Sequence, residues 1–278
     1  MSYPSILTIW DGENESRAAL EMARDLARQW SSHLEVACLG VDLAPVGFYA
    51  AELAHDVAND LVGEAKLEAK ELARAARDIL ASDDVRWSVR SAGLRLAELP
   101  AVVGKAAWFQ DLVILPRPFG RADEELAEAI LDAALFEAPA PTLVVPPNWS
   151  GDIGAEVLVA WNGSHEAARA LRAAMPILKK AKNVNAVMVD SGSRRSGCAD
   201  PGAALGAMLS RHGVNAEISL LPRSNGTVAD TLQRRATDIG ADMAVMGAYG
   251  HSRFRERVLG GATRDMLKTA ERPIFFAR

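Results

Sequence analysis

An internal repeat constrains the fold of this chain more than any other feature of its 278 residues. The segment ILTIWDG at residues 6–12 matches VLVAWNG at residues 157–163, and each is followed by a run with helical character. Further along, DLVILPRPFG at residues 111–120 occupies the place of DMAVMGAYG at residues 242–250. Because self-similarity of this kind marks a duplicated structural unit, we predict two copies of one unit in a single chain.

The segment PPNWSGDIG, residues 146–154, has the Pro, Asn and Gly content of a linker. We place the boundary near Gly151, which gives a first domain of residues 1–150 and a second of residues 151–278. A content of 49% hydrophobic and 24% charged residues indicates that each half can bury a core.

In both halves short apolar, β-branched runs alternate with Ala-, Leu- and Arg-rich runs of helical periodicity, which predicts parallel strands joined by crossover helices. Two of these runs, LVIL and MAVM, are apolar throughout, as expected of strands buried on both faces. We therefore predict an α/β fold with two repeated open parallel five-stranded sheets flanked by helices, Rossmann-like in architecture. The strands are expected near residues 5–10, 34–41, 85–90, 111–115 and 142–145, and near residues 157–161, 184–190, 214–221, 242–246 and 273–277.

The helical pattern predicts one helix over residues 14–30 and an equivalent one over residues 165–181. Residues 52–81 are charged on one face and apolar on the other, so we expect an amphipathic helix that covers the sheet or binds a partner. Residues 191–202, rich in Gly and Ser, are expected to be poorly ordered.

Composition excludes several classes of function. The net charge of −5 disfavours binding to nucleic acid, because no overall positive field attracts a phosphate backbone. Cys38 and Cys198 show neither metal-ligand spacing nor a disulfide framework, and they fit a reducing cytosol. The chain begins without a signal-like leader and has no apolar stretch of about 20 residues, so we expect a cytoplasmic protein that does not bind membranes.

The segment GAYGHSRFRERVLGGAT, residues 247–263, follows the fourth expected strand of the second half. Glycines let the backbone approach a ligand closely, and a helix N-terminus offers free N–H groups to an anion. The segment is thus suited to phosphates. The alternative is a loop whose glycines only make tight turns, and turn chemistry alone also explains Asn162-Gly163 and Asp11-Gly12.

This segment resembles the phosphate loop of ATP-binding universal stress proteins. The shared pattern, placed after a fourth parallel strand, is Gly, two residues, Gly, nine residues, Gly and a small residue. The resemblance covers both halves in architecture and the loop in the second half only. It implies an adenine-nucleotide α-hydrolase-like fold, and it implies ATP or a related adenine nucleotide as ligand, with Mg²⁺ as an accompanying ion that the family permits. In single-unit members the last strand pairs with that of a second molecule. We therefore expect the halves to pack as an intrachain pseudo-dimer, with a further homodimer left open.

Carried over residue by residue, the resemblance assigns the adenosine part of the ligand to the end of the first strand and the adenine pocket to Val189. Ribose and phosphates fall to the fourth strand end and its loop. The full set is Ala160, Trp161, Asn162, Val189, Met246, Gly247, Gly250, Gly260, Gly261 and Thr263. Nucleotide-binding members usually have Asp at the place of Asn162 and commonly Ser or Thr at the place of Gly261.

In the first half the corresponding loop is PRPFGRADEELAEA, residues 116–129. Pro116 and Phe119 stand for the first two glycines and Ala129 for the third, and Asp123, Glu124 and Glu125 lie between them. Since proline lacks an N–H donor and carboxylates repel phosphate, we predict that this site is inactive.

The leading hypothesis is a nucleotide-responsive stress or signalling protein, and the runner-up is a nucleotide-free module that binds a protein partner or another small ligand. The residues resemble neither a catalytic centre nor a metal site, so we predict that the chain is not an enzyme, with ATP hydrolysis at most slow and incidental. An adenylating ligase or a dinucleotide dehydrogenase ranks lower, because neither first strand is followed by the glycine-rich loop those enzymes use.

Overall fold

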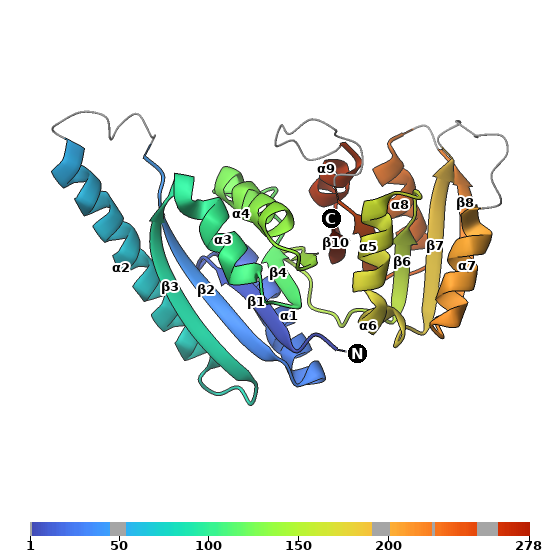
Figure 1. The fold of residues 1–278 in the computed structure, drawn as a ribbon, viewed down its shortest axis with the longest axis horizontal. Helices are drawn as coiled ribbons and strands as arrows, with labels where there is room; N and C mark the ends of the chain where they lie inside the picture. Colours follow the sequence, from blue (N-terminus) through green and yellow to red (C-terminus); the bar gives the residue numbers. More distant parts are fainter. Residues whose placement is uncertain (1, 45–53, 191–200, 224–225, 249–260) are drawn as a thin grey trace. The chain divides into compact units, whose positions relative to one another are not determined.

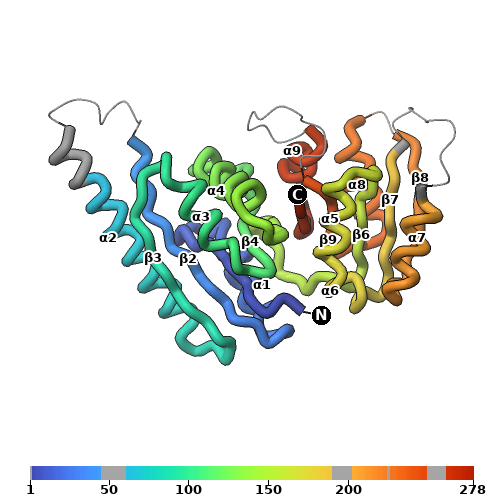
Figure 2. Tube along the Cα trace, in the orientation of Figure 1, coloured from blue at the N-terminus to red at the C-terminus, as the bar shows by residue number. Residues whose placement is uncertain are grey.

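A computed structural model describes residues 2–44, 54–190, 201–223, 226–248 and 261–278, which form two compact units, Ser2–Asn148 and Trp149–Arg278 (Figures 1 and 2). The division between the units falls within the Pro- and Gly-containing segment 146–154. Each unit has its own parallel sheet, and the two are called unit 1 and unit 2 below.

Unit 1 alternates strands and helices. Its sheet has the order β3-β2-β1-β4-β5, and the neighbouring strands run parallel. The elements are β1 (Ser5–Trp10), α1 (Asn14–Trp30), β2 (His33–Asp42), α2 (Ala54–Leu80), β3 (Arg86–Arg95), α3 (Leu99–Ala107), β4 (Leu112–Pro116), α4 (Glu124–Glu137) and β5 (Thr142–Val145).

Unit 2 repeats this arrangement in the order β8-β7-β6-β9-β10, again with parallel neighbours. Its elements are β6 (Glu156–Ala160), α5 (His165–Ala173), α6 (Met175–Leu178), β7 (Asn183–Asp190), α7 (Pro201–Arg211), β8 (Ala216–Pro222), α8 (Val228–Asp238), β9 (Met243–Gly247), α9 (Gly261–Lys268) and β10 (Ile274–Ala277). The α/β class and the repeated open parallel sheets predicted from the sequence are confirmed.

The helices form a layer on each face of each sheet. Right-handed crossovers place α1 and α2 on one face of unit 1 and α3 and α4 on the other, and α5 and α7 are likewise opposite α8 and α9 in unit 2 (Figure 1). The central strands β1, β4, β6 and β9 are buried almost throughout, as parallel strands covered on both faces must be. The predicted pairing of the two last strands concerns how the units sit relative to each other and stays a prediction.

Helix α2 confirms that residues 52–81 carry an amphipathic cover for the sheet. Its buried side chains are mostly small, and it packs on β2 and β3. A Cβ atom at Gly40 would lie 1.9 Å from the carbonyl oxygen of Ala65, and one at Gly93 would lie 2.5 Å from the backbone nitrogen of Lys66. The two glycines therefore allow this helix to approach the strand backbones directly.

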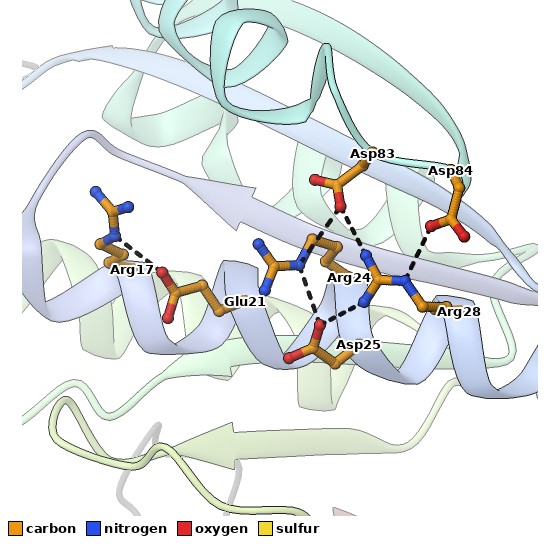
Figure 3. A network of polar contacts seen from close by, with 7 residues as sticks. All are labelled: Arg17, Glu21, Arg24, Asp25, Arg28, Asp83 and Asp84. Atoms are coloured by element: carbon orange, nitrogen blue, oxygen red, sulfur yellow. Dashed lines mark hydrogen bonds and ion pairs between the residues drawn. The ribbon is translucent and has the colours of Figure 1, made fainter.

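An ion-pair network ties the end of α1 to the turn after α2 (Figure 3). The Nη2 atom of Arg28 lies 2.7 Å from Asp83 Oδ1, and its Nε atom lies 2.9 Å from Asp84 Oδ1. Asp25 on the same helix accepts from both Arg28 and Arg24. Hydrogen bonding from Arg28 lowers the pKa of the Asp84 carboxyl below its usual value.

Two details of the secondary structure differ from the sequence prediction. The single helix expected over residues 165–181 is two helices, α5 and α6, because Pro176 has no N–H to continue the hydrogen-bond ladder and instead sits in the first turn of α6. Strand β3 extends to Arg95, five residues beyond the expected end. The segment 191–200 lies outside the described residues, and α7 follows it.

Candidate functional site

The candidate site lies where the strand order of unit 2 changes direction. Strand β6 pairs with both β7 and β9, and the chain proceeds outward to β8 on one side and to β10 on the other. The carboxyl ends of β6 and β9 thus form a topological switch point, the place where open α/β sheets bind ligands. The connections at this edge are residues 161–164 after β6 and residues 248–260 after β9.

The connection after β6 is a tight turn. The backbone N–H of Trp161 donates to the carbonyl oxygen of Val187 at 2.8 Å, and Asn162 Oδ1 accepts from the backbone N–H of Ser164 at 3.0 Å. Gly163 has φ +74°, a left-handed conformation that glycine adopts without cost, and Ser164 caps α5 by accepting from Ala167. Asn162 is exposed at the tip of the turn, so its amide is accessible to a ligand while its oxygen holds the turn.

Gly247, the last residue of β9, has a packing role that the sequence did not indicate. A Cβ atom there would lie 2.4 Å from the backbone nitrogen of Ala167 and 2.6 Å from the carbonyl carbon of Glu166. The end of β9 therefore touches the first turn of α5 backbone to backbone. Glycine at this position is required by the fold whether or not a ligand binds.

The start of α9 presents open space. Gly261 is exposed, and no described atom outside its immediate neighbours lies within 4 Å of a Cβ atom placed on it. Thr263, two residues further, is buried at 4% exposure. The N–H groups at the start of a helix carry a partial positive charge that suits an anion, and Gly261 begins α9.

The structure therefore brings most of the predicted residues to one edge of one sheet. Ala160 and Val189 are partly exposed near the carboxyl ends of β6 and β7, and Met246 is buried near the end of β9. Trp161, Asn162 and Gly247 complete this edge. Gly250 and Gly260 lie outside the described residues.

Unit 1 has a different arrangement at its equivalent switch point, between β1 and β4. Arg121, in the connection after β4, is buried to 1% side-chain exposure. Its Nη2 atom lies 2.6 Å from Asp11 Oδ2 at the end of β1, and its Nη1 atom donates to Ser16 Oγ at 3.3 Å. The guanidinium also pairs with Asp123 through Nε and Nη2. One arginine side chain thus joins the β1 turn, the first turn of α1 and the loop after β4.

Electrostatics keep this arginine charged. Burial alone would lower the pKa of Arg121, but its hydrogen bonds and ion pairs with Asp123 and Asp11 outweigh burial and raise the pKa above its usual value. The other carboxylate oxygen of Asp11 also has a partner: Asp11 Oδ1 accepts from the backbone N–H of Glu13 at 3.0 Å. The cluster is satisfied by residues of unit 1 alone.

Sequence reasoning missed Arg121, and it described Asp123 and Glu124 as charges that repel phosphate. In the structure Asp123 is neutralised by Arg121, and Glu124 accepts from the backbone N–H of Gly120 at 3.0 Å. The only sequence signal was an arginine next to the acidic residues of this loop, and its partner Asp11 is 110 residues away.

Two further classes of site receive no support from the described residues. They contain no group of three or more His, Cys, Asp or Glu side chains placed to hold a metal ion. Among the same residues, no helix combines the length and apolar character needed to cross a membrane.

The sequence matches no known family model, and no curated protein matches it. Among solved structures, the chain is similar to a universal stress protein from Archaeoglobus fulgidus, with a TM-score of 0.71 and 16% sequence identity over 99% of this chain and 96% of that one. A functionally unknown protein from Pseudomonas aeruginosa matches with a TM-score of 0.59 and 15% identity over 99% of this chain and 92% of that one. The fold of this chain is therefore that of a universal stress protein, which confirms the architecture that the sequence resemblance implied.

Proposed function

We propose that unit 2 binds an adenine nucleotide, ATP or a related compound, and that the chain acts as a cytoplasmic stress-response or signalling protein rather than as an enzyme. Binding would bias the protein between conformations or partners, since a ligand shifts an equilibrium by its differential affinity for the two states. No catalytic step is assigned to any residue.

The contrast between the two switch points carries the proposal. At the unit 1 edge a buried guanidinium fills the space between Asp11 and the loop after β4. At the unit 2 edge the corresponding residues are the exposed Asn162 and the buried Ala167, which offer neither a carboxylate nor a hydroxyl to such a cation. Among the described residues of the unit 2 edge, no side chain takes the place that Arg121 has in unit 1.

The described residues of this edge fit a nucleotide in part. The exposed amide of Asn162 can both donate to and accept from a ribose or base, and the first turn of α9 at Gly261 offers N–H groups to phosphate. Asn162 differs from the usual Asp of the family and supplies no charge to a metal ion. A Mg²⁺ ion would therefore be held mainly by the phosphates themselves, as is common for this ion.

A second candidate is a nucleotide-free module that binds a protein partner or another small ligand. The roles of Asn162 and Gly247 favour it, because the turn to Ser164 and the contact with Ala167 explain both residues without a ligand. The two candidates differ in whether adenine nucleotide accompanies the protein.

Two measurements test the proposal. Mass spectrometry of gently purified protein should detect AMP, ADP or ATP, and calorimetric titration with ATP should give a stoichiometry of one per chain. Repeating the titration with Mg²⁺ and with a chelator tests the accompanying ion. No heat of binding with any of the three nucleotides, together with no co-purifying nucleotide, would favour the second candidate, and two equivalent sites would contradict the assignment to unit 2 alone.

A further inference from the structure

The buried cluster of unit 1 carries an inference beyond nucleotide binding by unit 2. Three elements meet at Arg121: the turn after β1 through Asp11, the first turn of α1 through Ser16, and the loop after β4 through Asp123. The turn after β6 and the first turn of α5 are the equivalent elements of unit 2. In unit 1 the occupant of the switch point is a side chain of the protein.

We infer that Arg121 is an internal ligand of unit 1, a cation that holds the switch point closed and keeps it from taking a small molecule. Its guanidinium donates to two carboxylates and a hydroxyl, so the cluster is a built cation site with a planar occupant. Unit 1 is then a permanently closed copy of the fold.

The chemistry of the cluster explains why the closure is stable. Removing one partner of a buried ion pair leaves the charge of the other partner uncompensated where little water can solvate it, which is strongly unfavourable. If the guanidinium were withdrawn, the carboxylates of Asp11 and Asp123 would face an empty space without the cation that they both contact. These contacts therefore favour the position of the loop after β4 in which Arg121 reaches Asp11.

The composition of the other unit agrees with this division of roles. Asn162 and Ala167 in unit 2 occupy the positions of Asp11 and Ser16, so a guanidinium placed there would lack both partners. Unit 1 thus has the residues that hold an arginine at its switch point. Unit 2 lacks the carboxylate and the hydroxyl that such an arginine would need.

Chemical rescue tests the inference. In the full-length protein, Arg121→Ala should remove the occupant and leave a cavity lined by Asp11, Asp123 and Ser16. We expect the Tm of unit 1 to fall by about 5 °C, less than for a fully buried ion pair, because the side chains of Asp11 and Asp123 are 20% and 31% exposed. Methylguanidinium at millimolar concentration should restore part of this loss, and methylammonium should restore less, because an ammonium is a compact point charge without the planar fork of donors that Arg121 presents.

Arg17→Ala is the matched control, since Arg17 forms an exposed pair with Glu21 in the same unit, with 61% and 43% side-chain exposure. It should change Tm little and show no response to methylguanidinium. Equal effects of methylguanidinium on both variants, or an Arg121→Ala variant as stable as the control, would overturn the inference.

Asp11→Asn keeps the test decisive if Arg121→Ala does not fold. This variant retains Arg121 with Asp123 and Ser16 and removes one of the two carboxylate charges, so we expect roughly half of the Tm loss. A Tm equal to that of the unaltered protein would contradict an internal ligand. Adenine nucleotide is absent from all these measurements, so their outcome is independent of the function proposed for unit 2.

Discussion

A Cβ atom built on Gly247 would lie 2.4 Å from the backbone nitrogen of Ala167, a distance that real Cβ contacts do not show. The end of β9 and the start of α5 are therefore packed backbone to backbone, and neither partner is a flexible side chain that could move aside.

Gly247→Ala should consequently destabilise unit 2. We expect a loss of about 1–3 kcal/mol in the free energy of unfolding, the range found for overpacking. Denaturant titration measures it, with Gly261→Ala as control, because Gly261 begins a helix and has open space around it. The control should be neutral or slightly stabilising. A Gly247→Ala variant as stable as the control would show that the two elements can separate freely.

Gly260→Val tests the predicted phosphate loop. If the backbone at this position approaches a phosphate, a β-branched side chain will occupy the space of ligand atoms and restrict the backbone. Binding of ATP at micromolar concentration should disappear in calorimetric titration while the far-ultraviolet circular dichroism stays unchanged. Ala129→Val, the matching change in unit 1, should leave binding as it was. Parent-like binding by folded Gly260→Val would refute the loop assignment.

Asn162→Asp and Gly261→Ser restore the residue types that the resemblance associates with nucleotide binding. The fold should tolerate both, since a carboxylate can still accept from Ser164 and the start of α9 has room for a hydroxymethyl group. The carboxylate in Asn162→Asp and the added hydroxyl in Gly261→Ser should each raise the affinity for ATP by roughly 3- to 10-fold, the gain expected from one stronger or additional hydrogen bond. Weaker binding in both variants would indicate that this edge recognises something other than a nucleotide.

Arg28→Ala should alter the acid titration of Asp84 (Figure 3). The hydrogen bond from Arg28 lowers the pKa of Asp84 in the folded protein, so this contact stabilises the fold above the unfolded-state pKa and is lost as the pH falls through the lowered value. Without Arg28 the pKa of Asp84 should rise toward its usual value, as carbon-detected NMR can follow. Arg17→Ala, further along α1, should not change it; an unchanged pKa in Arg28→Ala would mean that the pair is absent in solution.

Pairing of β5 with β10 is predicted from the apolar last strands and from the pairing of single-unit universal stress proteins. If the strands pair, the amides on the outer edges of Thr142–Val145 and Ile274–Ala277 should exchange slowly with deuterium, because an unpaired edge leaves them open to solvent. Rapid exchange at both outer edges, beside slow exchange at the inner ones, would exclude the intrachain pseudo-dimer.

The sequence by itself determined the repeated α/β architecture. Apolar runs such as LVIL indicate strands buried on both faces, because strand and helix periodicity is a local property of the chain. The matching segments ILTIWDG and VLVAWNG indicate the duplication. It also located the edge of the sheet at which Asn162 and Gly247 lie, since parallel strands end together.

The tertiary structure alone decided what several of these residues do. The contact of Gly247 with Ala167 joins segments 80 residues apart, and the pairing of Arg121 with Asp11 joins segments 110 residues apart. Neither contact can be recognised from sequence periodicity, because one contact between distant residues imposes no pattern on the residues around them. For the same reason the acidic loop of unit 1 could be recognised as unsuited to phosphate from its composition, while the cation that neutralises it became visible only in the fold.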